Sequence, residues 1–581
     1  MSLARDITSL ETETEYDLMH EFDDAIRNDD DCYTTANVGE VMSEPQTPLS
    51  LSTQVTAIEV SGHAMRASRG IDEINPYART MLHTNCNRAL FNMMETFYRE
   101  IGYMEDTRVP EICFMGHPLN RPDVKKTAVD RFGIPSVFTQ IYRFIDVLWN
   151  TFVIVPSIQE KETHHFENYK LDLGAVQDPK LLYAQIEKSL KEAAGVWYYH
   201  LRNSMASSFG YNFVAAVLLP RDPNQELTAD HFSDIATLFS SCQNIVSADV
   251  PAAIKELAQT IITAGRAREF QEMKPSDAMD WLNGSESGQA GTKFQEFLAK
   301  HGHRSIAEID IGATSWKSDP TSLIATLQTM LRDEKSLWTK KEELSVEEAI
   351  AKLKSIGFVQ RQLLKFFVPV ARTGVVRREH SKNVAIKVTD LIRGGYRQLG
   401  TLLANQGYLP DSELIFYLSH LEIADLIQER PAKLVAKAVR RRKLMHILKT
   451  HHYPEVMIGQ PKPIEQNVHK AHAPASVVIK GTPVSQGLTE GPVRVARRLI
   501  DAKDTQPGEI LIATSTDIGW SPYFPMLSGV VTELGGLLSH GAVVAREYGL
   551  PCIVNAQNAT QLFKTGDRAR LDASTGILEK L

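Results

Sequence analysis

The sequence predicts a multidomain fold in which a long, mainly α-helical region precedes a small C-terminal β/β/α domain. The length of 581 residues exceeds what one ordinary hydrophobic core accommodates. Apolar residues recur at helical spacing from about residue 77 to residue 448. From Val477 onward, short strand-like runs between turn residues replace that periodicity. A proline-rich stretch separates the two patterns and marks the expected domain boundary.

Composition and charge exclude several classes of protein. The chain is 43% hydrophobic and 23% charged, which is typical of a folded globular protein. Its net charge of −8 argues against a general nucleic-acid binder. The five cysteines are scattered without a CxxC pair, so neither a disulfide framework nor a zinc site is indicated. The acidic N-terminus lacks a signal-peptide core, and the richest apolar run, 213–219, is too short to cross a bilayer. We therefore expect a cytoplasmic protein with neither a membrane nor a nucleic-acid partner.

The helical region contains three long amphipathic stretches, which we interpret as core helices. They are Met81–Tyr103, Leu181–Phe209 and Val346–Ala371. The short apolar segment Glu111–Asn120 is less clear, because it fits a strand or hairpin inserted among the helices as well.

A histidine-rich segment, Leu298–Pro320, interrupts the helices and raises the question of a metal site. His301 and His303 stand two positions apart before a glycine, with Glu308 and Asp310 close behind. This spacing does not place two imidazoles on one face of a helix. A hydrogen-bonded structural loop is the preferred interpretation, and no metal ligand is predicted.

A basic cluster lies on the predicted helix Val375–Leu399. Arg378 and Lys382 are four positions apart and therefore share a helix face. Such residues most often form a solvated charged face. The alternative is that they neutralise the oxygens of a phosphoryl group during its transfer. Spacing alone favours the solvated face over the phosphoryl-transfer role.

The expected domain boundaries follow from the change in pattern. Residues 1–452 form the mainly helical domain, and residues 477–581 form the C-terminal domain. Between them, residues 453–476 contain several prolines and few apolar residues, which predicts a flexible linker.

The segment Thr532–Val554 carries the strongest chemical signal. A strand-like run ends at a glycine pair, a single histidine follows, and a short helix then runs to Gly549. A histidine can carry a phosphoryl group covalently, and the N-terminus of a helix stabilises an anion. We predict that His540 is the carrier. The residues expected to surround its phosphate are Thr532, Gly535, Gly536, Ser539 and Gly541.

The motifs TELGGLLSH and ARExGxP, with STDIGWSPYFP before them, resemble the phosphohistidine swivelling domain of the phosphoenolpyruvate-utilising enzymes. The resemblance implies that His540 accepts a phosphoryl group in an ATP-grasp domain and delivers it to an acceptor elsewhere. The sequence departs from the pyruvate-type members at two positions. Leu538 and Gly541 stand where those members usually carry threonine and alanine.

Three upstream segments resemble the helical acceptor domain of the rifampicin phosphotransferases. They are TTANVGEVMSEPQTPLS, HGHRSIAEIDI, and RREHSK taken together with ELIFYLSHLEI. This likeness implies that residues 1–452 bind the acceptor and that Arg378 and Lys382 lie near its hydroxyl group. A small-molecule acceptor is therefore the expected partner.

No stretch of the sequence resembles an ATP-grasp domain, and no Walker-type motif occurs. ATP and Mg²⁺ are therefore expected to act through a separate or missing ATP-grasp domain or subunit. The expected function is that of a kinase-type phosphotransferase, or of its acceptor-plus-carrier portion, acting on a hydroxyl-bearing small molecule. Two alternatives remain open: phosphorylation of pyruvate, as in phosphoenolpyruvate synthase, and a non-catalytic binding or regulatory role.

Overall fold

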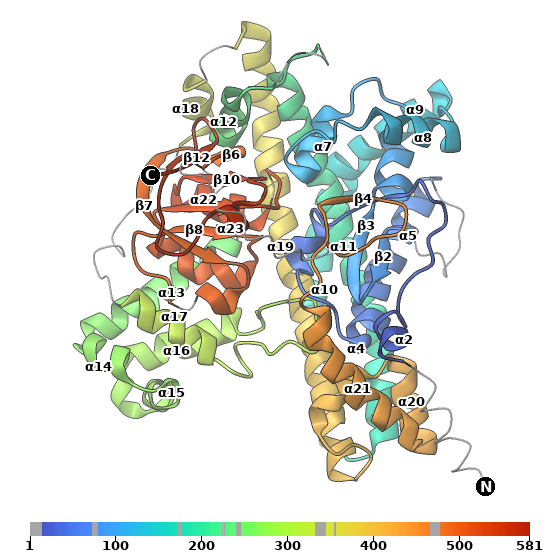
Figure 1. The fold of residues 1–581 in the computed structure, drawn as a ribbon, viewed down its shortest axis with the longest axis vertical. Coiled ribbons are helices and arrows are strands. Elements are labelled where there is room, and N and C mark those ends of the chain that lie inside the picture. Colours follow the sequence, from blue (N-terminus) through green and yellow to red (C-terminus); the bar gives the residue numbers. More distant parts are fainter. Residues whose placement is uncertain are drawn as a thin grey trace.

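Two long antiparallel helices form the axis of the molecule in this computed structural model (Figure 1). They are α11 (Pro179–Leu218) and α19 (Phe358–Asn405). The C-terminal domain lies on one side of this pair and an N-terminal sheet lies on the other. The structure describes residues 14–71, 80–171, 176–222, 225, 227–239, 246–331, 344–353, 356–464, 477–502, 504–537 and 539–581.

Small residues allow α11 and α19 to approach closely. A Cβ atom added at Gly210 would lie 2.9 Å from Cα of Ala371, and one added at Gly374 would lie 2.9 Å from Cα of Ser207. Real Cβ atoms do not approach so closely, so larger side chains would force the helices apart. The pair therefore positions the α19 residues that follow Gly374 against α11.

The N-terminal sheet is antiparallel and has the strand order β2-β3-β1-β4. Its strands are β1 (Cys32–Thr34), β2 (Leu82–Asn85), β3 (Arg88–Asn92) and β4 (Val456–Ile458). The strand β4 lies within the expected linker 453–476. The remainder of that linker from residue 465 onward lies outside the described residues.

The helix predicted for residues 81–103 is wrong in its first half, which forms the β2–β3 hairpin. Cys86 and Asn87 have φ angles of 46° and 61°, and two positive φ values are what a tight two-residue hairpin turn requires. Helical structure starts only at η2 (Met93–Tyr98) and α6 (Arg99–Ile101). The apolar spacing of this second half dominated the sequence pattern.

The strand or hairpin considered for residues 111–120 is also wrong. Most of its apolar residues belong to the helix α7 (Arg108–Met115), which ends at Gly116 with a φ of 89°. Within α7, Glu111 accepts hydrogen bonds from the hydroxyl groups of Tyr98 and Thr107, both at 2.8 Å. These contacts bury a carboxylate that the sequence shows only as an acidic residue in an apolar run.

The remaining helices surround the long pair. They are α2 (Glu15–Met19), α3 (Val38–Val41), α4 (Pro48–Ser50), η1 (Leu51–Val55), α5 (Thr56–Ser68), α8 (Pro122–Phe132), α9 (Val137–Trp149), η3 (Asn150–Ile154), α10 (Val155–Glu167), α12 (Ala229–Leu238), α13 (Val246–Thr263), α14 (Ala267–Glu272), α15 (Pro275–Asn283), η4 (Ser285–Ser287), α16 (Gln289–His301), α17 (Thr321–Met330), α18 (Val346–Ala351), η6 (Ser412–Tyr417), α20 (His420–Glu429) and α21 (Ala432–Leu448).

The C-terminal domain is built on an eight-stranded sheet with the order β5-β12-β11-β7-β8-β9-β10-β6. The four strands from β7 to β10 are parallel, and the others pair antiparallel. Its elements are β5 (Val478–Lys480), β6 (Thr482–Ser485), β7 (Leu488–Ala496), η7 (Leu499–Ala502), β8 (Ile510–Ala513), η8 (Ile518–Met526), β9 (Gly529–Thr532), α22 (His540–Tyr548), β10 (Cys552–Val554), α23 (Ala559–Leu562), β11 (Arg568–Asp572) and β12 (Ile577–Lys580). The molecule is thus multidomain, as predicted, with a mainly helical part followed by a small sheet domain.

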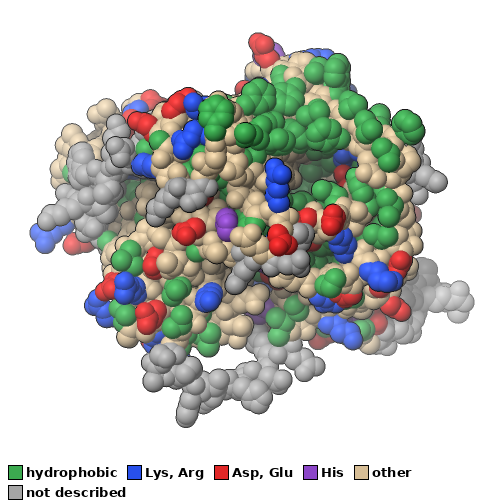
Figure 2. Space-filling model, turned by 90° about the horizontal axis from the view of Figure 1, so that it is seen from above, with side chains coloured by type: hydrophobic (Ala, Val, Ile, Leu, Met, Phe, Trp, Pro, Cys, Tyr) green, Lys and Arg blue, Asp and Glu red, His purple; other side chains and the backbone are tan. Residues whose placement is uncertain are grey.

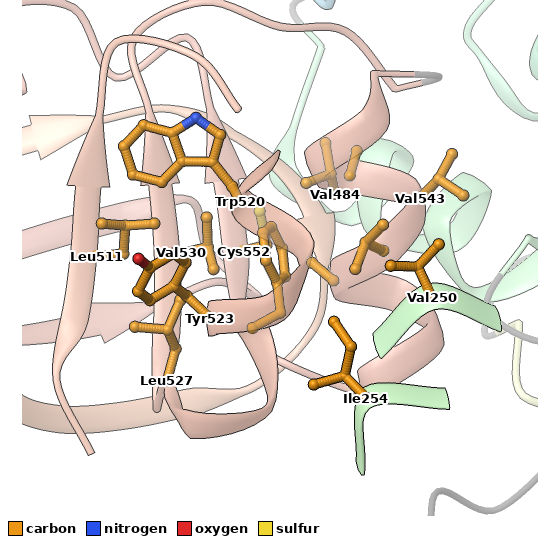
Figure 3. Packing of buried hydrophobic residues seen from close by; sticks show 14 of the residues in the cluster. Val250, Ile254, Val484, Leu511, Trp520, Tyr523, Leu527, Val530, Val543 and Cys552 are labelled. Atoms are coloured by element: carbon orange, nitrogen blue, oxygen red, sulfur yellow. The ribbon is translucent and has the colours of Figure 1, made fainter. Parts of the chain in front are cut away.

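One hydrophobic core joins the C-terminal domain to the helical part. Figure 3 shows Val250 and Ile254 of α13 beside Val543 of α22, with Trp520 and Tyr523 of η8 in the same cluster. All of these side chains are buried at 8% exposure or less. The structure therefore captures the C-terminal domain docked against α13.

The segment from α9 to α10 exposes much apolar surface. Residues Val137–Glu167 are long and apolar enough to cross a bilayer by length and composition, and 17% of the apolar window is buried. The sequence analysis expected no apolar run long enough to cross a bilayer. It missed this segment because polar residues divide the run into short pieces, although the helix continues through them. Phe138 is 86% exposed, and hydrophobic side chains gather on this side of the molecule (Figure 2). An ion pair of 2.9 Å between Arg69 and Asp146 holds α9 to α5.

Candidate functional site

His540 is the first residue of α22. Ser539 caps this nine-residue helix, and its Oγ accepts the backbone N–H of Ala542 at 3.3 Å. The side chain of His540 lies at the end of the helix where backbone N–H groups give a partial positive charge. It is 6% exposed, so a group bound to it would be shielded from bulk water in this docked arrangement.

The glycines around His540 are required by close packing. A Cβ atom at Gly541 would lie 2.2 Å from Oγ1 of Thr516, and one at Gly536 would lie 3.1 Å from the carbonyl oxygen of Phe114. Gly535 has a φ of 139°, which L side chains rarely adopt. The carrier segment therefore rests directly on the C-terminus of α7. Thr532 ends β9 in the same segment and is 3% exposed.

The electrostatic surroundings keep His540 neutral. Burial, together with the positive charge of Lys382, lowers the pKa of its imidazole to about 3. Arg304 and Arg378 act in the same direction, while Glu379 partly opposes them. A neutral imidazole retains a nucleophilic nitrogen, which a covalent phosphoryl carrier requires.

The structure brings Arg378 and Lys382 to the His540 site rather than to an open surface. The Arg378 and Lys382 side chains are 17% and 15% exposed. Arg378 Nη2 lies 2.8 Å from Glu379 Oε1, and Lys382 Nζ lies 3.9 Å from Glu308 Oε2. Cations held at partial burial next to a helix N-terminus form a site suited to a dianionic group.

The histidine-rich segment supports this cation cluster. Arg304 Nη1 and Glu308 Oε1 are 2.8 Å apart, and both side chains are buried. His303 Nε2 lies 2.9 Å from Oδ1 of Asn383 on α19. Asp310 accepts a hydrogen bond of 2.8 Å from the hydroxyl group of Thr47. His303, Glu308 and Asp310 are thus engaged with protein partners that fix the segment against α19 and α4.

A group of possible metal-ligating residues lies elsewhere, at the N-terminal segments. His20, Asp23 and Cys86 have ligand atoms within 4.8 Å of one another. His20 Nδ1 and Asp23 Oδ2 are 2.6 Å apart, and Asp23 also accepts hydrogen bonds from Asn85 and Cys86. The carboxylate is therefore already occupied by hydrogen-bond donors.

Two residues of the site were missed by the sequence analysis. Asp517 caps η8 and accepts the N–H of Gly519 at 2.9 Å. Burial raises the pKa of its carboxyl group to about 6, and the negative charge of Glu308 contributes. His200 of α11 contacts Ser381 of α19 at 3.1 Å. The contact of His200 with Ser381 and the effect of Glu308 on Asp517 both join segments far apart in the chain, so no local sequence pattern could reveal them.

Comparison with known proteins connects this geometry to a family. Residues 505–576 match the mobile domain of the PEP-utilising enzymes, and residues 200–379 match the fourth domain of rifampicin phosphotransferase. The matched regions include His540 and Arg378. The chain is similar to the rifampicin phosphotransferases.

The curated relatives support this similarity. The rifampicin phosphotransferase of Bacillus cereus is 30% identical over 357 residues, which is 59% of this chain and 41% of that protein. The Bacillus subtilis rifampicin phosphotransferase is 29% identical over 356 residues, with the same coverage. Prodigiosin synthesizing transferase PigC of Serratia marcescens is 30% identical over 298 residues, or 49% of this chain and 33% of that protein. The aligned part of this chain thus spans about two fifths of the rifampicin phosphotransferases, and the similarity supports a role in the phosphotransferase family.

Proposed function

We propose that this chain is the acceptor-plus-carrier portion of a phosphotransferase in which His540 carries the phosphoryl group. The observation that carries the proposal is the position of a buried, neutral imidazole at a helix N-terminus, with the charges of Lys382, Arg304 and Arg378 acting on it. Phosphoryl transfer depends on positioning and on neutralising the charge of the transferred group. This arrangement provides both.

In the proposed reaction, a hydroxyl oxygen of the acceptor attacks the phosphorus atom of phospho-His540. The new P–O bond forms as the P–N bond breaks, and the bonding electron pair returns to the imidazole nitrogen. Lys382 and Arg378 stabilise the charge on the phosphoryl oxygens as the group moves. Because the two cations lie on α19, they belong to the acceptor side of the interface.

The acceptor is proposed to be a bulky, largely apolar small molecule with a hydroxyl group. A series of aromatic rings runs from η3 across α11 to α19. The rings of Phe152 and Phe209 lie 6.4 Å apart, Phe209 and Phe213 lie 6.3 Å apart, and Phe213 stacks on Phe367 at 3.6 Å. On α19, Phe367 lies three helical turns before Arg378 (eleven residues at about 3.6 per turn). This surface favours an apolar ligand that extends along α19 from Phe367 toward Arg378.

The phosphoryl donor is proposed to be ATP with Mg²⁺, bound by an ATP-grasp domain or subunit. The segment that joins β4 to β5 would let the C-terminal domain move between that donor site and the docked position seen here. We propose that these steps take place in the cytoplasm, without a membrane or nucleic-acid partner.

The test is to incubate the chain with ATP labelled in both its β- and γ-phosphates and the ATP-grasp domain of a rifampicin phosphotransferase. Native protein is expected to gain acid-labile phosphate, mapped to His540 by mass spectrometry. The His540→Ala variant should gain none at this position. Rifampicin and pyruvate are then supplied as separate acceptors, and transfer to pyruvate would favour the phosphoenolpyruvate synthase-like alternative. An unlabelled native protein beside a labelled rifampicin phosphotransferase control would support a non-catalytic role.

A further inference from the structure

A second histidine faces the cation cluster from the opposite helix. His200 lies on α11, and its Nδ1 is 3.1 Å from the Oγ of Ser381 on α19. Ser381 Oγ donates its only hydrogen to the backbone carbonyl oxygen of Arg378 at 2.9 Å. At the contact with His200, Ser381 can therefore only accept.

This chain of hydrogen bonds selects one tautomer of His200. Its Nδ1 carries the hydrogen that Ser381 accepts, so the lone pair of the neutral ring is on Nε2. That atom lies 3.5 Å from the Oγ of Ser204, one turn further along α11. A long contact of this kind is readily replaced by a shorter one to an incoming hydroxyl group.

The position of His200 relates it to the transfer site. The charges of Arg378, Lys382 and Glu379 act on His200, and the same three residues act on His540. Ser381, which orients the imidazole of His200, lies between Arg378 and Lys382 in the sequence of α19. The two histidines therefore border one charged cluster, one from the helical part and one from the C-terminal domain.

We propose that His200 is the general base of the transfer and that its Nε2 takes the proton from the acceptor hydroxyl group. The inference rests on the function proposed above. As the oxygen attacks phosphorus, its proton passes to Nε2 of His200, and the P–N bonding pair returns to the imidazole of His540. That imidazole then recovers one proton through solvent from His200, so the complete step neither releases nor consumes a proton.

The charges explain why this base acts only when the phosphoryl group is present. Without it, burial and the cations Arg378 and Lys382 lower the pKa of His200 to about 3, which leaves a weak base. A phosphoryl group on His540 brings negative charge that offsets these cations. The pKa of His200 then rises, and its affinity for the hydroxyl proton increases as the phosphorylated domain docks.

The test charges the protein chemically, so it needs no donor domain. Purified chain is treated with phosphoramidate, a small-molecule phosphoryl donor to histidine, and the loss of phosphate from His540 is followed by mass spectrometry from pH 5 to pH 9. Water and added methanol serve as acceptors, and methyl phosphate is measured as the product of the latter. Native protein is expected to transfer faster as the pH rises and then reach a plateau, because deprotonated His200 is the active form.

His200→Asn is the decisive variant. Its side-chain amide can still donate to Ser381, but it has no basic atom in place of Nε2. We expect about 100-fold slower formation of methyl phosphate and loss of the pH-dependent rise, with the same level of phospho-His540 at the start. Ser381→Ala should give a smaller loss, of about 3- to 10-fold, because the imidazole remains but its tautomer is no longer fixed.

His303→Gln is the matched control, because His303 is also buried and a glutamine amide can replace its bond to Asn383. Its transfer rate should remain within about twofold of native. A native rate and pH profile in His200→Asn would overturn the base assignment and leave the carrier function intact. If phosphoramidate labels other histidines but not His540, both proposals fail. Thermal unfolding of each variant identifies any loss of fold.

Discussion

Two buried histidines of this protein, His540 and His303, share a lowered pKa but differ in their contacts and in their position in the fold. Both have pKa values below the ordinary range because burial disfavours the charged ring. His303 donates its Nε2 hydrogen to Asn383 and thereby fixes a loop against α19. His540 instead begins a helix in the field of Lys382, Arg304 and Arg378. Burial alone therefore does not indicate chemistry. Arg304 acts on both histidines, so the distinguishing features of His540 are the helix terminus and the additional charges of Lys382 and Arg378.

The largest effect should come from removing Lys382, the cation that lowers the pKa of His540 most. Lys382→Ala is expected to slow phosphoryl transfer by about 100- to 1,000-fold, because the charge on the transferred group loses a fixed partner. Rapid-quench measurement of product formation checks this. Lys387→Ala is the control, since Lys387 lies on the same helix but pairs with Glu167 at 3.9 Å. An equal loss in both variants would contradict a specific role for Lys382.

Replacing His303 should lower folding stability and leave phosphorylation of His540 unchanged. His303→Ala leaves Oδ1 of Asn383 buried without its donor, so the free energy of unfolding should fall by about 1–3 kcal/mol. The amount of phospho-His540 formed under native conditions should stay the same. Denaturant titration and phosphate mapping measure the two quantities. A variant of native stability would show that the contact with Asn383 contributes nothing.

A methyl group next to the carrier tests how tightly its surroundings are packed. Gly541→Ala would place Cβ 2.2 Å from Oγ1 of Thr516, and the resulting shift should cost about 1–3 kcal/mol of folding stability. The double variant Gly541→Ala/Thr516→Ala should recover most of this loss. Thermal unfolding of both single variants and of the double variant gives the coupling. Additive losses would mean that the two residues do not clash.

The last prediction concerns the pH dependence that Asp517 gives to folding stability. Its pKa is raised from 3.8 to about 6, so the folded state binds a proton more tightly than the unfolded chain. Folding stability should therefore be greatest at low pH with respect to this group, and decline as the pH rises from about 4 to about 6. Asp517→Asn should remove this part of the pH dependence. Urea titrations between pH 4 and pH 7 check it, and an unchanged slope would refute the shift.

The carrier segment could be predicted from sequence because its signals are local. The strand, the glycine turn, the position of His540 and the helix stop at Gly549 all follow from neighbouring residues, and the structure has them as β9 and α22. Gly549 has the φ of 63° that ends such a helix. Local order of this kind is readable without knowledge of the rest of the fold.

The remaining parts depend on contacts between distant segments. His200 acquires its orientation from Ser381, which is 181 positions away. The β2–β3 hairpin looked helical because its partner strand β1 lies far upstream and contributes nothing to the local periodicity. The likeness to known acceptor domains placed Arg378 and Lys382 near the transfer site, whereas spacing alone favoured a solvated face. A site whose residues come from two domains has no sequence pattern within either domain that predicts it.

The contact between Gly116 and the Gly535–Gly536 pair has a practical consequence. A Cβ atom at Gly116 would lie 2.6 Å from the carbonyl oxygen of Gly535, so the two domains meet here backbone to backbone. Any larger side chain would act as a wedge that holds the carrier away from the acceptor without touching His540 or the cations. Gly116→Val thus offers an uncoupler, with which charging of the histidine and its discharge become separately measurable events.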